Sequence, residues 1–225
     1  MEYLFDTANL DEIQKYQAIF PFTGVTTNPT ILKQEGKVDF FDHFRKIRAL
    51  IGDQRSLHIQ IVSETAAGIV AEAHALLEKI DSQVFIKIPV HEAGLAAMQI
   101  LKKEGVGITA TAIYTEVQAL TAVAAGADYL AVYFNRMDAI NIDPCAVIAN
   151  TALAIRQTGS NAKILGASFK NIGQVNRAFA AGAAAVTIQP DLLHHALQMP
   201  SITQAVADFK ADWQSLYGDR TIADL

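Results

Sequence analysis

The sequence has 225 residues, 51% of them hydrophobic, and a formal charge of -5. This length allows one large hydrophobic core, so we expect a single domain over residues 1–225. Acidic and basic residues are scattered along the chain, which argues against a nucleic-acid-binding face. No apolar run reaches bilayer length, which argues against a membrane protein. Cys145 is the only cysteine, so no intrachain disulfide can form and a cytoplasmic location is the simplest inference.

Short apolar strands alternate with longer helical patterns along the chain, as in βα units around a parallel sheet. Strands are predicted over 3–6, 24–27, 57–62, 84–88, 108–112, 129–133, 163–167 and 185–188. Helices are predicted over 10–19, 39–51, 65–80, 92–103, 115–125, 144–157, 171–181 and 192–198. These are eight units of roughly 28 residues, so we predict an α/β fold, a (β/α)8 TIM barrel.

The stretch 201–217 lies outside this eight-fold pattern and is predicted to be an extra amphipathic helix. Its apolar residues recur at helical spacing: Ile202, Val206, Phe209, Trp213 and Leu216. Such a helix either plugs one end of the barrel or packs on a neighbouring subunit.

The strand at 84–88 contains a lysine, Lys87, between apolar residues. Burial disfavours the ammonium form, so a lysine here needs an explanation. Two structural explanations are an ion pair with a buried carboxylate and a side chain that extends past the strand end. The third is a functional site.

In a barrel of this type the chemistry lies at the C-terminal ends of the strands. The polar residues there are Asp6, Thr27, Asn28, Gln60, Lys87, Thr109, Thr111, Tyr133, Ser168 and Gln189. Strand periodicity supports a polar interior on three strands. If His58, Gln60, Phe85, Lys87, Thr109 and Thr111 point inward, the apolar residues between them face the helices: Leu57, Ile59, Ile61, Val84, Ile86, Ile88, Ile108, Ala110 and Ala112. This pattern favours a functional site around Lys87.

A desolvated lysine amine attacks a ketone and forms a Schiff base, which acts as an electron sink for making or breaking a carbon–carbon bond. Tyr133 is the candidate acid/base group, with Gln60 and Thr111 orienting a water that relays its proton. Asp6 is placed to bind substrate hydroxyls and balance the iminium charge. Asn28 is a candidate ligand of a hydroxyl. The alternative for each is a satisfied structural hydrogen bond.

A phosphate site is also predicted. Arg136 follows Tyr133 by three residues, and Ser168 ends the seventh strand. Arginine binds phosphate through two nitrogens, and a serine hydroxyl with helix N-terminal amides completes such a pocket. The alternative is a surface ion pair between Arg136 and Asp138.

Several segments together resemble the small transaldolase-like family, and within it the fructose-6-phosphate aldolases. They are Gly24-Val25-Thr26-Thr27-Asn28-Pro29, Lys87-Ile88-Pro89-Val90, Glu92-Ala93-Gly94-Leu95-Ala96-Ala97, Tyr133-Phe134-Asn135-Arg136 and Ala167-Ser168-Phe169-Lys170. The resemblance spans nearly the whole chain.

The resemblance implies a Schiff base on Lys87 and no cofactor. It implies Tyr133 as acid/base through a water held with Gln60 and Thr111, and Asp6 and Asn28 around a dihydroxyacetone unit. It implies Arg136 and Ser168 as phosphate ligands. Thr27 and Ala167, which lie in the matching segments, are counted with the substrate-binding residues. The family forms pentameric rings that pair as decamers, with the last helix reaching a neighbour, so a homo-oligomer is expected.

Two activities share this scaffold. One cleaves fructose 6-phosphate to dihydroxyacetone and glyceraldehyde 3-phosphate. The other, the transaldolase reaction of the pentose phosphate pathway, transfers the same three-carbon unit between sugar phosphates. Transaldolases have Glu at the position of Gln60 and usually Phe at that of Tyr133, so these two residues favour the aldolase. His58 departs from the family pattern, since this position is usually apolar.

Two other function classes are compatible with a barrel of this kind. A metal-dependent aldolase needs clustered ligands, and of the six histidines only His58 lies at an inward strand position, so no metal site is expected. A non-catalytic sugar-phosphate-binding barrel would keep Arg136 and Ser168 without needing an amine in the core.

Overall fold

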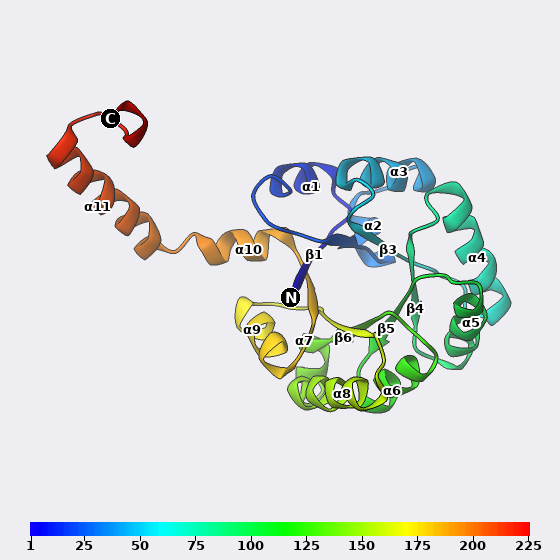
Figure 1. The fold of residues 1–225 in the computed structure, drawn as a ribbon. Coiled ribbons are helices and arrows are strands. Elements are labelled where there is room, and N and C mark those ends of the chain that lie inside the picture. Colours follow the sequence, from blue (N-terminus) through cyan, green and yellow to red (C-terminus); the bar gives the residue numbers. More distant parts are fainter. The chain divides into compact units, whose positions relative to one another are not determined.

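Eight parallel strands pair in chain order and close into a barrel in the computed structural model, which describes residues 1–225 (Figure 1). The predicted (β/α)8 barrel is therefore confirmed. The strands are β1 (Glu2–Asp6), β2 (Gly24–Thr26), β3 (Ser56–Gln60), β4 (Phe85–Pro89), β5 (Ile108–Ile113), β6 (Tyr129–Tyr133), β7 (Lys163–Ala167) and β8 (Ala185–Ile188).

Helices form an outer ring around these strands (Figure 1). They are α1 (Leu10–Tyr16), α2 (Pro29–Gln34), α3 (Phe40–Ile51), α4 (Ala66–Lys79), α5 (Glu92–Lys103), α6 (Glu116–Ala124), α7 (Phe134–Asp138), α8 (Pro144–Thr158) and α9 (Ile172–Ala181). A further helix, α10 (Pro190–Leu197), follows β8 along the chain.

Two short helices, α2 and α7, were not predicted. Helix α2 begins because the Asn28 side chain accepts a hydrogen bond from the Ile31 amide and Pro29 occupies the first helical position. The extended Asn28 backbone, at φ -158° and ψ 168°, agrees with the bend expected before a proline.

The interior of the barrel contains a cluster of side chains from the inner faces of four neighbouring strands, β1, β6, β7 and β8. Its members are Leu4, Tyr129, Ala131, Tyr133, Leu165, Ala167 and Ala185, with Phe85 packed against them. Because successive side chains of a strand alternate between its two faces, Asp6 and Lys87 share this inner face with Leu4 and Phe85. Both polar residues lie nearer the C-terminal ends of their strands.

Strand β5 departs from the predicted alternation. Its pairing with β6 shifts between Ala110 and Ile113, and Ala112 has a φ of 56°. Ala112 therefore packs against the interior cluster, whereas we predicted that it faces the helices. A β-bulge re-aims side chains in this way, and it lets Ala112 face inward in addition to Thr111.

The strand that contains Lys87 is packed closely by the helix that follows it. A Cβ atom at Gly94 in α5 would collide with the backbone carbonyl oxygen of Pro89. Only glycine allows the helix and the strand end to approach this closely.

Residues 191–225 form a second compact unit, which is described here by itself. It contains α11 (Pro200–Tyr217), as predicted, and a short 3-10 helix (Ile222–Asp224). The Trp213 indole nitrogen donates to the Arg220 carbonyl oxygen at 2.7 Å, which connects α11 to the segment before the 3-10 helix. Three large apolar side chains of α11 are largely exposed: Val206, Phe209 and Leu216. None of the helices in the chain combines the length and the apolar character needed to cross a membrane.

Candidate active site

Lys87 lies in the barrel interior with 2% of its surface exposed. Its Nζ donates one hydrogen bond, to the Thr27 carbonyl oxygen at 3.2 Å, and forms no ion pair with a carboxylate. The amine lines a cavity of about 210 Å³ at the C-terminal ends of the strands, which we call the lysine cavity. The two structural explanations for this lysine, an ion pair and an exposed amine, are therefore wrong.

Burial is the main influence on the Lys87 ammonium. It lowers the pKa of Lys87; nearby Asp6 acts in the opposite direction, and Arg136 lowers the pKa further. Burial likewise raises the pKa of Asp6, opposed by Lys87, by a hydrogen bond from Thr26 and by Arg136. Both shifts favour uncharged forms, so the amine is closer to the nucleophilic state than a lysine in water.

Asp6 is oriented by two threonine hydroxyls. Its Oδ1 accepts a hydrogen bond from Thr26 Oγ1 at 2.7 Å, and Thr26 Oγ1 lies 2.6 Å from Thr187 Oγ1. All three side chains come from neighbouring strands, β1, β2 and β8. Asp6 and Thr187 also line the lysine cavity.

Tyr133 ends strand β6 and contacts two other predicted site residues. Its hydroxyl accepts a hydrogen bond from Thr111 Oγ1 at 3.1 Å. The guanidinium carbon of Arg136 lies 4.6 Å from the centre of its ring. Burial raises the pKa of Tyr133, while the Thr111 hydrogen bond and Arg136 act in the opposite direction. The resting phenol is therefore protonated at neutral pH.

Arg136 lies in α7, directly after β6, and lines the lysine cavity. Its Nη1 donates to the Tyr114 hydroxyl at 3.2 Å, and this contact raises the pKa of Arg136. The alternative ion pair of Arg136 with Asp138 is wrong, because Asp138 pairs with Arg177 at 3.7 Å.

Ser168 follows β7 in a left-handed backbone conformation, with a φ of 63°. Its carbonyl oxygen accepts a hydrogen bond from the Asn135 amide at 3.2 Å, which ties it to the start of α7. A non-glycine residue at positive φ is strained, and such strain is concentrated at functional sites.

The structure brings most of the predicted site residues to the lysine cavity. Those that line it are Asp6, Asn28, Lys87, Tyr133, Arg136, Ala167 and Ser168. Thr111 contacts one of these residues, because its hydroxyl donates a hydrogen bond to Tyr133. Thr27 contributes its carbonyl oxygen to Lys87, whereas its hydroxyl donates to the His58 carbonyl oxygen.

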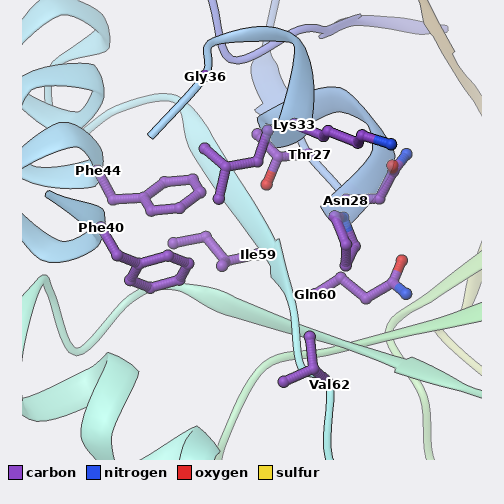
Figure 2. A pocket seen from close by; sticks show the side chains of 11 residues that line it. Thr27, Asn28, Lys33, Gly36, Phe40, Phe44, Ile59, Gln60 and Val62 are labelled. Atoms are coloured by element: carbon purple, nitrogen blue, oxygen red, sulfur yellow. The ribbon is translucent and has the colours of Figure 1, made fainter. Parts of the chain in front are cut away.

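Gln60 lines a neighbouring, mainly apolar cavity of about 390 Å³, together with Thr27 and Asn28. Figure 2 shows Phe40, Phe44 and Ile59 on one side of it and the amide groups of Asn28 and Gln60 on the other. Gln60 pairs with Lys87 across β3 and β4, and its Oε1 is buried without a hydrogen-bond partner. An unsatisfied buried acceptor is costly and rare, so this oxygen is available for a substrate or water donor.

Sequence reasoning missed three side chains that support the site: Thr26, Thr187 and Tyr114. A sequence signal existed for Thr187, which is the one polar residue in the apolar strand Ala185–Ile188. No comparable signal links Tyr114 to Arg136, because the bulge in β5 precedes it. No group of three or more His, Cys, Asp or Glu side chains is placed to hold a metal ion.

Comparisons with known proteins show which family this chain resembles. The transaldolase/fructose-6-phosphate aldolase family model matches residues 3–220. A curated protein of Streptococcus pneumoniae, described as a probable fructose-6-phosphate aldolase, is 52% identical over 222 residues, covering 99% of this chain and 100% of its own.

Two solved structures share the fold at low identity. A thiamine phosphate pyrophosphorylase from Pyrococcus furiosus has a TM-score of 0.58 and 10% identity, with 83% of this chain and 84% of its own covered. A structure described as native KDPGal has a TM-score of 0.58 and 15% identity, with 84% and 82% covered. The match of the family model over nearly the whole chain, together with the 52% identical relative, shows that this chain belongs to the transaldolase/fructose-6-phosphate aldolase family.

Proposed function

We propose that this chain is a class I aldolase that cleaves and forms fructose 6-phosphate through a Schiff base on Lys87. The observation that supports it most is the state of the amine. Lys87 is buried, lines a cavity, has one hydrogen bond and no carboxylate bound to it. A nucleophilic amine needs this combination of desolvation and free space.

In the proposed reaction Lys87 Nζ attacks the C2 carbonyl of fructose 6-phosphate, and loss of water gives an iminium ion. A base removes the proton of the C4 hydroxyl, and the C3–C4 bond breaks. Its electron pair moves to the iminium, which leaves an enamine and releases glyceraldehyde 3-phosphate. Protonation of the enamine at C3 and hydrolysis release dihydroxyacetone and regenerate the amine. Asp6, beside Lys87, offsets the iminium charge.

Tyr133 is the proposed acid/base group. Its phenol begins protonated, and Thr111 holds the phenol oxygen from one side. Gln60 Oε1 supplies an acceptor without a partner, so that Gln60 and Thr111 orient a water between Tyr133 and the substrate. Asn28 binds a hydroxyl group of the dihydroxyacetone unit. Thr27 contributes its backbone carbonyl oxygen, which accepts a hydrogen bond from Lys87.

Arg136 and Ser168 are proposed to bind the phosphate of the aldehyde, with Ala167 beside them. Both line the lysine cavity, and the guanidinium is held at its edge by Tyr114. Arginine suits this role because its planar nitrogens match two phosphate oxygens.

A transaldolase reaction is the second candidate, because the family includes both activities and the same amine would start both. We favour the aldolase because position 60 is Gln and position 133 is Tyr. The non-catalytic sugar-phosphate-binding barrel is disfavoured by the desolvated amine, which such a protein would not need.

Borohydride trapping tests the proposal. Reduction of the Schiff base in the presence of dihydroxyacetone or fructose 6-phosphate should leave a stable adduct on Lys87, located by peptide mass mapping. Lys170 lines the same cavity and is an internal control for non-specific labelling. The Lys87→Met variant should give no adduct, and Lys170→Met should label normally. No adduct, or an adduct on Lys170, would overturn the proposal.

Two expectations accompany it. The exposed apolar residues of α11 support a homo-oligomer, pentamer or decamer, in which this helix contacts a neighbour. The single free cysteine, Cys145, agrees with a cytoplasmic location.

A further inference from the structure

We propose that Thr187 is a positioning residue for Asp6, and that it acts through the hydroxyl of Thr26. The inference rests on the proposed function, because Asp6 is proposed to offset the iminium charge in the same site. It assigns Thr187 and Thr26 a role in positioning Asp6 for the proposed reaction.

The two hydroxyls meet over the inner face of β1. Thr26 is in register with Asp6 on one side of β1, and Thr187 is in register with Leu4 on the other. Their oxygens are 2.6 Å apart, and the residues are 0% and 1% exposed. A contact this short between buried hydroxyls is a hydrogen bond.

Counting hydrogens gives the direction of the chain. Each threonine hydroxyl has one hydrogen to donate. Thr26 donates to Asp6 Oδ1 at 2.7 Å, so its oxygen acts as the acceptor toward Thr187. Thr187 therefore donates to Thr26, which donates to Asp6. Hydrogen bonds connected in this way polarise one another, and this order stabilises the ionised carboxylate.

The relay matters because Asp6 is a partly desolvated carboxyl group. Burial raises the pKa of Asp6, and the hydrogen bond from Thr26 counteracts it. The titratable groups facing Asp6 are Lys87 on β4, Arg136 on α7 and Tyr133 at the end of β6. No hydrogen bond from the protein reaches Oδ2, so this oxygen is available to the substrate while Oδ1 is held in place.

The test compares Thr187→Val, which removes the hydroxyl and keeps the shape, with Thr187→Ser, which keeps the hydroxyl. We expect Thr187→Val to lower kcat/KM for fructose 6-phosphate cleavage about tenfold, the effect of one lost hydrogen bond. The acidic limb of its pH profile should move to higher pH, because the carboxylate is less stabilised. Thr187→Ser should restore both quantities.

Thr151→Val is the matched control. Thr151 is a fully buried threonine in α8 whose hydroxyl has no hydrogen-bond partner. The same chemical change there should leave kcat/KM and the pH profile unchanged.

A double-mutant cycle tests whether Thr187 acts through Thr26. In a Thr26→Val background, the change Thr187→Val should have no further effect. Additive losses would overturn the proposal, as would an unchanged pH profile in Thr187→Val or equal losses in the Ser and Val variants. If Thr187→Val does not fold, Thr187→Ala replaces it under the same criteria.

Borohydride trapping separates this proposal from the proposed function. A wild-type chain without an adduct on Lys87 contradicts the proposed function. A wild-type adduct together with an unaltered Thr187→Val enzyme contradicts the relay alone.

Discussion

Arg136 lies over the ring of Tyr133, with its guanidinium carbon 4.6 Å from the ring centre. The two residues belong to adjacent elements, β6 and α7, with only two residues between them in the chain. The proposed phosphate ligand and the proposed acid/base group are therefore placed by one short turn of backbone.

Replacing Arg136 should weaken the binding of phosphorylated acceptors. Arg136→Ala removes the proposed bidentate, charge-assisted phosphate contact, for which about 1.5–3 kcal/mol is expected, so KM for glyceraldehyde 3-phosphate should rise about ten- to a hundredfold. Steady-state kinetics of the synthesis direction give this value. Unphosphorylated glyceraldehyde is the control substrate, and its kinetics should change far less. Equal losses for both aldehydes would refute the phosphate assignment.

The residue at position 60 should control the balance between cleavage and transfer. Gln60→Glu places a carboxylate at the position in register with Lys87 on the neighbouring strand, as the family resemblance implies for transaldolases. We expect a higher ratio of transfer to cleavage, measured with fructose 6-phosphate alone and with added erythrose 4-phosphate. Gln189→Glu is the matched control, because Gln189 lines the lysine cavity from another strand end and undergoes the same charge change. A ratio that is unchanged in Gln60→Glu, or shifted equally in both variants, would contradict this role.

The strands and the long helices were predictable because their signals are local and repeated. All eight strands were predicted to within about two residues at each end, since buried apolar runs alternate with amphipathic stretches along the chain. Helices α2 and α7, at 6 and 5 residues, are too short to show a helical repeat. The Asn28-Pro29 pair is the one sequence signal for the start of α2.

The inward side of the site was predictable from period-two alternation, whereas the partners of its side chains were not. Alternation placed Lys87 on the inner face, and Asp6 was predicted from its position at a strand end; both line the lysine cavity. It failed at Ala112, because a bulge is an insertion that no residue type in Thr109–Ile113 indicates. Tyr114 follows this bulge and lies 22 positions from Arg136 in the chain, so sequence spacing pointed to the nearby Asp138 instead.

Ser168 should show a trade-off between stability and binding. Its left-handed backbone costs about 1–2 kcal/mol in a non-glycine residue, and glycine relieves this cost. Glycine also gives the unfolded chain more conformational freedom, which lowers stability by about 0.4–1 kcal/mol. Ser168→Gly should therefore have a free energy of unfolding equal to or slightly above that of the wild type. Ser168→Ala keeps the strain and also loses the hydroxyl.

Both Ser168 variants should bind glyceraldehyde 3-phosphate more weakly to a similar degree, because both lack the hydroxyl. Urea unfolding and acceptor KM values provide the two measurements. A Gly variant less stable than the Ala variant would show that the backbone at Ser168 is not strained.

His58 should make the barrel sensitive to acid. Its Nδ1 contacts the Thr109 hydroxyl at 2.7 Å, and its Nε2 contacts the Ser56 hydroxyl at 2.8 Å. Burial, with smaller effects of Lys87 and Arg48, lowers the pKa of His58 to about 3. In the unfolded chain this histidine has a pKa of about 6.5. Between these values the unfolded chain binds a proton that the folded chain excludes, so stability falls as the pH falls.

The contribution of His58 to the free energy of unfolding is complete above about pH 6.5. It decreases by about 1.4 kcal/mol per pH unit in the middle of this pH range and is lost near pH 3. His58→Leu should remove this slope, although it lowers stability at neutral pH by leaving the Ser56 and Thr109 hydroxyls without the ring. Urea unfolding at several pH values between 3 and 7 measures both effects. The control variant is His91→Gln, which shows how the loss of an exposed histidine changes the pH dependence of stability. His91 is a helix N-cap without a side-chain hydrogen bond. Parallel curves for the wild type and His58→Leu would mean that the buried ring accepts a proton without unfolding the chain.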